Sequence, residues 1–220
     1  DLDEEGAEDL LAEIAKKLKS RKTGKVVRLE LAGPRDSKLI DYLVEQFQVS
    51  GDEVYENLKM LDLVFIKNLG DVDGMAGLKY PEFTPNPSPA FKSDDIFEDI
   101  RRNDIFLSVP FESFDPVVRL VERAAADPDV LAIKQVLYRV SGNSPIVKAL
   151  SHAAEDGKQV SVMIELKARF DEESNINWAQ KLEKAGCHVV YGIVGLKTHC
   201  KALMIIRRED DGVRRYVHLG

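Results

Sequence analysis

The chain has 220 residues, of which 44% are hydrophobic and 31% charged, a composition typical of globular rather than disordered proteins. Its 31 basic and 38 acidic side chains give a net charge of −7, which argues against a general nucleic-acid coat. Apolar runs such as Val160–Ile164 are far shorter than the ~20 residues of a membrane span. The acidic start, Asp1–Glu5, is unlike a signal peptide. We therefore expect a cytoplasmic protein with one large or two small domains.

Charge is distributed unevenly along the chain. Residues 1–130 hold 17 Lys and Arg against 28 Asp and Glu, a balance of −11, whereas residues 131–220 hold 14 against 10, a balance of +4. The second part can therefore hold an anion locally, although the whole chain is acidic. An acidic helical surface that happens to precede a neutral α/β unit is the alternative interpretation.

The first 90 residues favour a small α+β segment. Apolar residues at helical spacing predict a helix over residues 5–20, and alternating β-branched residues predict a strand over 25–31. Further helices are expected over 36–47 and 62–69. The interval 70–93 then contains three glycines and four prolines, which exclude a regular element. We place the domain boundary here, with one domain at 1–90 and the second at 91–220.

The second part alternates between strands and helices. Strands are predicted over 104–109, 130–138, 158–167, 187–191, 198–208 and 213–219. Helices are expected between them, opened by Asp115-Pro116, by Ser144-Pro145 and by Asp171. The alternation predicts an α/β fold with a mixed, largely parallel sheet, flanking helices and a final antiparallel hairpin. The chain reaches Gly220 with no closing helix, which we interpret as a truncation.

Two arginines follow predicted parallel strands. Arg139 ends the strand 130–138, and Arg169 follows the strand 158–167. Ligands of open α/β sheets bind beyond the carboxyl ends of such strands, and a guanidinium group can hold a phosphate with two hydrogen bonds. If the two strands are adjacent, both arginines border one anion site. Alternatively, each arginine pairs with a local acid, such as Asp171.

A short basic segment gives the sharper chemical signal. In Gly195-Leu196-Lys197-Thr198-His199-Cys200-Lys201, a strand would project His199 and Lys201 on the same face. An imidazole nitrogen beside an ammonium group can attack phosphorus while the cation neutralises the non-bridging oxygens. An incidental histidine at a solvated strand end would show the same spacing.

Longer stretches of the sequence closely resemble polyphosphate kinases of the first family. The resemblance is nearly continuous from about Asp95 to Gly220 and looser before it. The segments that carry it are Leu78–Pro85, Phe111–Val118, Asp127–Gln135, Leu137–Arg139, Glu165–Glu173, Asn175-Ile176, Gly186–Tyr191, Gly195–Lys201 and Arg215–Gly220.

The resemblance implies reversible transfer of the terminal phosphate of ATP to the end of a polyphosphate chain. His199 occupies the position of the family's phosphohistidine, and His218 that of a histidine that assists catalysis. Arg139 and Arg169 match a pair at the magnesium–phosphate site, where we expect them to hold phosphate oxygens beside Mg²⁺ rather than to ligate the ion. Lys197 and Lys201 are further phosphate-binding candidates.

The resemblance also implies a fold and partners. Residues 91–220 would form most of the first phospholipase-D-like catalytic domain, and residues 1–90 the later part of the preceding helical region. The partners would be ATP or ADP and inorganic polyphosphate, without nucleic acid. The parent protein would be a homo-oligomer, and a peripheral location at the inner membrane face would be compatible with it.

Two other functions compete with this one. A phosphodiesterase of the phospholipase D type would require an acid four residues after Lys201, where this chain has Ile205. A non-catalytic polyanion-binding module would use the same cations for affinity alone. Because the family members are several times longer, we expect this chain to be inactive by itself, since groups that neutralise the leaving ADP would be missing.

Overall fold

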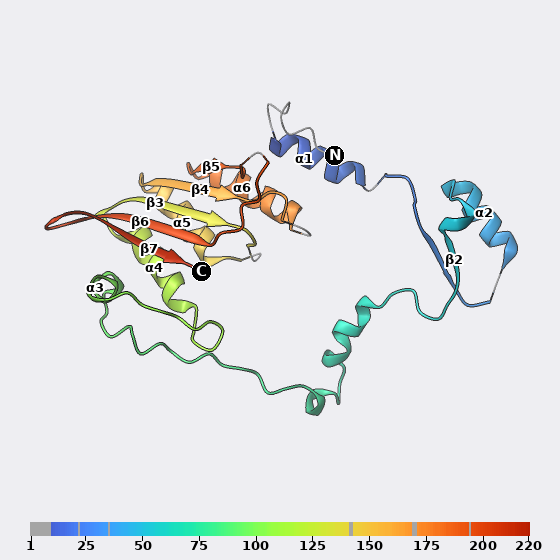
Figure 1. The fold of residues 1–220 in the computed structure, drawn as a ribbon, viewed down its shortest axis with the longest axis horizontal. Helices are drawn as coiled ribbons and strands as arrows, with labels where there is room; N and C mark the ends of the chain where they lie inside the picture. The colour runs from blue at the N-terminus through green and yellow to red at the C-terminus, as the bar shows by residue number, and fades with distance from the viewer. Residues whose placement is uncertain (1–9, 22, 35, 141–142, 169–170, 194) are drawn as a thin grey trace. The chain divides into compact units, whose positions relative to one another are not determined.

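The computed structural model describes residues 10–21, 23–34, 36–140, 143–168, 171–193 and 195–220 (Figure 1). The chain divides into two compact units, Lys19–Thr84 and a larger one that joins Asp1–Leu18 to Pro85–Gly220. The boundary that the sequence places between residues 90 and 91 stays a prediction. In the described part of the chain, no helix combines the length and apolar character that a membrane crossing requires.

The unit Lys19–Thr84 contains a βαβ arrangement. Strand β1 (Leu29–Ala32) pairs in parallel with β2 (Val54–Leu58), and α2 (Ser37–Phe47) connects them. Asp36 caps this helix, because its Oδ1 accepts the N–H groups of Lys38 and Leu39 at 3.0 and 3.2 Å. The sequence predicted the helix and a strand at 25–31 but missed β2. The expected smaller α+β segment is present.

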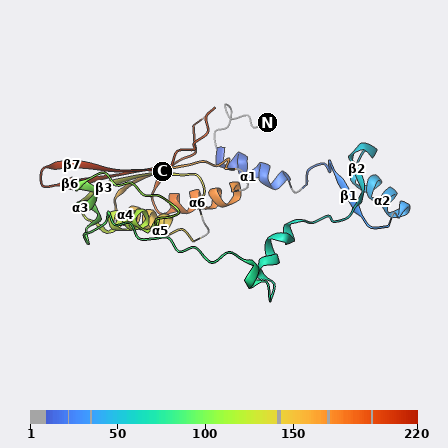
Figure 2. The same cartoon turned by 60° about the horizontal axis from the view of Figure 1, so that its bottom comes forward.

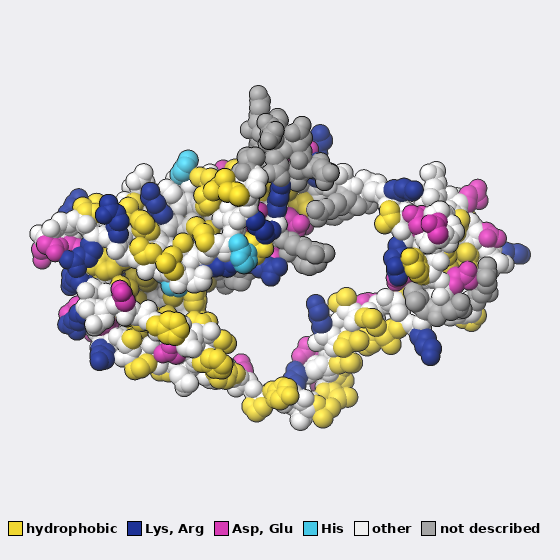
Figure 3. Space-filling view, viewed as in Figure 1, with side chains coloured by type: hydrophobic (Ala, Val, Ile, Leu, Met, Phe, Trp, Pro, Cys, Tyr) yellow, Lys and Arg dark blue, Asp and Glu magenta, His cyan; other side chains and the backbone are white. Residues whose placement is uncertain are grey.

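The stretch that follows β2 is short of regular structure. It contains the 3₁₀ helices η2 (Val64–Asp71) and η3 (Ala76–Leu78), while a further 3₁₀ helix, η1 (Gly51–Glu53), precedes β2. Its hydrophobic side chains are exposed, reaching 83% for Leu78 and 96% for Tyr80. Figure 3 shows these side chains gathered along the segment. The glycines and prolines of 70–93 therefore do interrupt regular structure, as predicted.

The larger unit is built on a five-stranded mixed sheet. Its spatial order is β5-β4-β3-β6-β7, and its strands are β3 (Val130–Leu137), β4 (Gln159–Ile164), β5 (His188–Val190), β6 (Ala202–Glu209) and β7 (Gly212–Leu219). The first three strands in this order are parallel, and β6 and β7 run antiparallel as a hairpin. This confirms the predicted α/β class with a mixed sheet and a terminal hairpin.

Helices pack against this sheet on one side, as Figure 2 shows for α4, α5 and α6. The helices of the unit are α1 (Leu10–Arg21, shared with the smaller unit), α3 (Ile96–Arg102), α4 (Asp115–Ala126), α5 (Pro145–Glu155) and α6 (Glu172–Lys184). The core between helices and sheet includes Leu150, Ile133 and Ile205, each fully buried. Alternate residues of β4 are buried because successive side chains of a strand point to opposite faces.

One predicted strand is wrong. Residues 104–109 form no strand, although their composition favours one. Phe106 is 84% exposed and no neighbouring strand pairs with this stretch, because the sheet ends at β5 and β7. The preceding α3 was not predicted, although Asp95 caps it by accepting the N–H of Phe97 at 3.0 Å.

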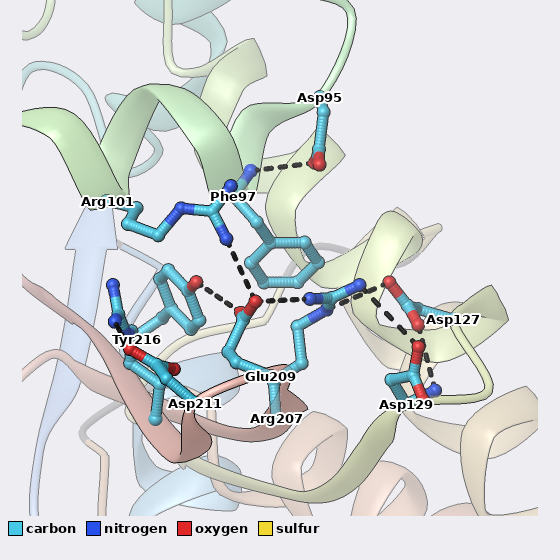
Figure 4. A network of polar contacts seen from close by, with 10 residues as sticks. Asp95, Phe97, Arg101, Asp127, Asp129, Arg207, Glu209, Asp211 and Tyr216 are labelled. Atoms are coloured by element: carbon cyan, nitrogen blue, oxygen red, sulfur yellow. Dashed lines mark hydrogen bonds and ion pairs between the residues drawn. The ribbon is translucent and has the colours of Figure 1, made fainter.

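A buried charge network ties the β6–β7 hairpin to the helices (Figure 4). Arg207 of β6 contacts Asp127 at 3.2 Å and Glu209 at 2.9 Å, and its side chain is 17% exposed against 4% and 6% for the two acids. Arg101 of α3 also contacts Glu209, at 2.9 Å, and the Tyr216 hydroxyl donates to Glu209 at 2.5 Å. The network lies at the start of β3, so the hairpin is anchored at the end of the sheet away from the carboxyl end of that strand.

Candidate functional site

Four of the predicted site residues contact the ring of Tyr138, which lies at the carboxyl end of β3. The His199 ring packs edge-on against it, with centroids 4.7 Å apart. The ammonium nitrogens of Lys201 and Lys197 lie 4.9 and 5.6 Å from its centroid, and the guanidinium carbon of Arg139 lies at 5.8 Å. Each cation is within the range of a cation–π interaction. One half-buried aromatic ring is thus contacted by an exposed imidazole and by three positively charged groups.

The segment that carries His199 is not a strand, which corrects the sequence prediction. Strand β6 begins at Ala202, whose partner is Leu219 at the end of β7, and the N–H of Gly220 bonds to the Lys201 carbonyl at 2.9 Å. The pairing of β6 with β7 therefore stops at Ala202, because β7 ends at Leu219. His199 and Lys201 both contact the Tyr138 ring, and the Lys201 ammonium also donates to the His199 carbonyl at 2.5 Å.

Arg139 contacts an acid as well as the tyrosine ring. Its Nε lies 2.8 Å from Oδ2 of Asp171, with side-chain exposures of 59% and 33%. This is the local pairing that the sequence left open as the alternative to anion binding. Because pairs this exposed contribute about 0–1 kcal/mol, an incoming phosphate can replace the carboxylate at little cost. Arg169, the second predicted arginine, lies outside the described residues.

His218 lies near this cluster on the neighbouring strand β7. Its half-buried ring packs edge-on against Phe114 at 6.2 Å, and burial lowers its pKa below the usual 6.5. Burial therefore favours the uncharged form of this ring. A methyl group added to Gly220 would lie 3.2 Å from His218 Cε1 and 3.8 Å from Lys201 Cβ, so these two side chains flank one small space.

The chemistry of the site suits an anion. Three cations and one imidazole lie against the Tyr138 ring, and Asp171 is the acid that the structure pairs with Arg139. Nitrogen donors at this density match the oxygens of phosphate groups. Among the described residues, no three His, Cys, Asp or Glu side chains group as a metal site. These side chains therefore do not fit direct coordination of a metal ion, and arginine and lysine cannot supply it.

Sequence reasoning missed Tyr138 as a member of the site. It appeared in the sequence as the last apolar position of a strand followed by an arginine, and position alone does not show where a ring points. The useful signal was its place at the carboxyl end of a buried parallel strand, next to Arg139.

Two models of the polyphosphate kinase family match the chain. The polyphosphate kinase C-terminal domain 1 matches residues 95–220, and the polyphosphate kinase middle domain matches residues 1–69.

Named relatives agree with these models. The polyphosphate kinases of Rhodopirellula baltica and Halalkalibacterium halodurans are each 50% identical to this chain over 221 aligned residues. These alignments cover 100% and 99% of this chain but 26% and 31% of the relatives. The crystal structure of polyphosphate kinase from Porphyromonas gingivalis superposes with a TM-score of 0.63 at 31% identity, covering 86% of this chain and 28% of that one. The chain thus spans about a third or less of the proteins it resembles.

Proposed function

The chain belongs to the polyphosphate kinase family, and on that premise we propose that the full-length protein is an ATP:polyphosphate phosphotransferase that works through a phosphohistidine at His199. The observation that carries the proposal is the gathering of His199, Lys197, Lys201 and Arg139 around Tyr138. This cluster supplies a nucleophile together with the positive charges that neutralise the oxygens of a transferred phosphoryl group.

The reaction proceeds in two reversible steps. An imidazole nitrogen of His199 attacks the terminal phosphorus of ATP; the N–P bond forms, the bond to the bridging oxygen breaks, and ADP leaves with that electron pair. A terminal oxygen of polyphosphate then attacks the same phosphorus, and the N–P bond breaks. The chain has grown by one phosphate and the imidazole is regenerated. Lys197, Lys201 and Arg139 neutralise the non-bridging oxygens throughout.

We assign supporting roles to two other residues. Burial favours the uncharged form of His218, and this residue lies beside Lys201, where it can accept a proton. Arg169 is assigned to phosphate from the family resemblance alone. Mg²⁺ belongs to the proposal as an ion carried by the phosphates of the nucleotide, and no step above depends on it.

The wider assignment concerns the parent protein. We propose that residues 91–220 form most of its first phospholipase-D-like catalytic domain and residues 1–90 part of the preceding region; the family models matched at 95–220 and 1–69 support this. Its partners would be ATP or ADP and polyphosphate. A cytoplasmic homo-oligomer that binds no nucleic acid remains the expectation. The 220-residue chain alone should not elongate polyphosphate, because it spans 26–31% of its relatives.

Labelled ATP tests the function directly. The full-length protein, incubated with ATP labelled at the terminal phosphate, should gain acid-labile, base-stable phosphate on His199, and His199→Ala should gain none. A protein that binds polyphosphate but forms no such phosphoenzyme is a polyanion-binding module, which would overturn the proposal. The phosphodiesterase alternative is further weakened by Ile205, which is fully buried in the core and occupies the position that the required acid would need.

A further inference from the structure

Glu165 is a buried acid beside the candidate site. It follows β4, is 5% exposed, and its carboxylate accepts two backbone N–H groups. Oε1 accepts from Lys167 at 3.0 Å, and Oε2 accepts from Thr198 at 2.8 Å. The two donors belong to segments 31 residues apart in sequence. The Lys197 ammonium donates to the Lys167 carbonyl at 3.2 Å and joins the same two segments a second time.

Asn175 fixes the other side of this arrangement. This residue of α6 is fully buried, and its Nδ2 donates to the carbonyls of Tyr138 and Glu165, each at 2.9 Å. The N–H of Glu165 also donates to the Leu137 carbonyl at 3.1 Å. The carboxyl ends of β3 and β4 are therefore joined where Tyr138 and Glu165 leave the sheet.

These contacts form a continuous path to the nucleophile. It runs from the backbone of Tyr138 through Asn175 and Glu165 to the N–H of Thr198, the residue directly before His199. Strand pairing cannot place His199, because β6 begins three residues later. The backbone before His199 is instead bound to a buried carboxylate, and its ring rests on Tyr138.

We propose that Glu165 is a positioning residue for phosphoryl transfer, which holds His199 over Tyr138 by binding the Thr198 N–H, and that Asn175 supports it. The kinetic consequence of this inference rests on the proposed function. Glu165 itself does not touch the reacting atoms. Its effect is orientation, and a displacement of about 1 Å in a reacting group can cost roughly 100-fold in rate.

Glu165→Gln in the full-length protein is the sharpest test. The side chain keeps its size, but one oxygen becomes an NH₂ group that cannot accept a backbone N–H. We expect kcat per folded molecule to fall roughly 10- to 100-fold, with KM for ATP changed less than about threefold. The shape of the pH profile should stay the same, because the carboxylate binds backbone rather than the imidazole. A wild-type kcat, or a shifted pH profile, would overturn the positioning role.

Asp127→Asn is the matched control. Asp127 is buried to the same degree, 4% exposed, and its Oδ1 also accepts a backbone N–H, from Asp129 at 2.9 Å, but it lies before β3 rather than after it. This variant should lose stability and keep wild-type kcat per folded molecule. An equal loss of kcat in both variants would make Glu165 merely structural and refute the proposal.

Amide hydrogen exchange tests the contact without relying on activity or on a folded variant. In the wild-type protein, the Thr198 amide should be protected although it lies outside any strand, and Glu165→Leu, which leaves no acceptor oxygen, should abolish that protection. Rapid exchange at Thr198 in the wild type would refute the proposal even if the variant fails to fold. If the wild type forms no phosphohistidine, the proposed function fails, while the exchange result still decides whether Glu165 fixes this segment.

Discussion

Replacing Arg207 with methionine should strongly destabilise the larger unit. The change leaves two carboxylates, 4% and 6% exposed, without their shared guanidinium group. Removing one partner from a buried ion pair typically costs 3–5 kcal/mol. Asp127 keeps the N–H of Asp129, and Glu209 keeps Arg101 at 2.9 Å. We therefore expect the lower end of the range, about 3 kcal/mol of unfolding free energy.

Urea denaturation followed by tryptophan fluorescence measures this loss. Trp178 is the single tryptophan of the chain and lies in α6, so its signal reports on the larger unit. Arg214→Met is the control, because Arg214 pairs with Asp211 at side-chain exposures of 37% and 69%. Pairs this exposed contribute less than about 1 kcal/mol. An Arg207→Met loss no greater than that of the control would refute the reasoning.

The difference in unfolding free energy between the wild type and Arg207→Met should also depend on pH. Burial opposes ionisation of Glu209, but the hydrogen bonds from Tyr216 and Arg207 outweigh it and hold its pKa below the usual 4.5. A lowered carboxyl pKa adds stability above the unfolded-state value, and this stability is lost as the pH falls through the folded-state value. The gap in stability between wild type and Arg207→Met should therefore shrink below about pH 4.5.

Three further experiments test the site and the burial of two side chains. Tyr138→Ala should slow phosphorylation of His199 roughly tenfold by removing the ring beneath it, whereas Tyr138→Phe should match the wild type in the same assay. Since burial lowers the pKa of His218, the wild type should lose stability as the pH falls below 6.5, and His218→Asn should lose less in parallel thermal melts. Burial raises the pKa of the Cys187 thiol to about 11, so native protein at pH 8 should be alkylated at the exposed Cys200 alone. Mass spectrometry would contradict this by finding both thiols labelled.

The sequence predicted the fold correctly where the local residue pattern and the tertiary contacts favour the same element. The helix opened by Ser144-Pro145 and the buried strand β4 followed from capping and alternation. Residues 104–109 have the composition of a strand but no partner, and pairing is a property of the whole sheet. Missing β2 has the same cause, because its short, mixed sequence is stabilised by pairing with β1.

The sequence identified residues of the candidate site but did not predict how their side chains are arranged. His199, Lys201 and Arg139 were identified from their place after strands and from the family resemblance. Their shared contact with Tyr138 could not be deduced, because it depends on where four side chains point beyond the ends of strands. The role of Glu165 likewise depends on its burial and on its hydrogen bond to Thr198, which residue type and spacing do not show.

The ion pair between Arg139 and Asp171 has a consequence for selectivity. An anion that binds Nε of Arg139 would take the place of a carboxylate, and this exchange would cost little because the pair is exposed. A molecule with several linked negative groups would also meet Lys197 and Lys201 beside the same tyrosine ring, so we expect long polyanions to bind better than single ions.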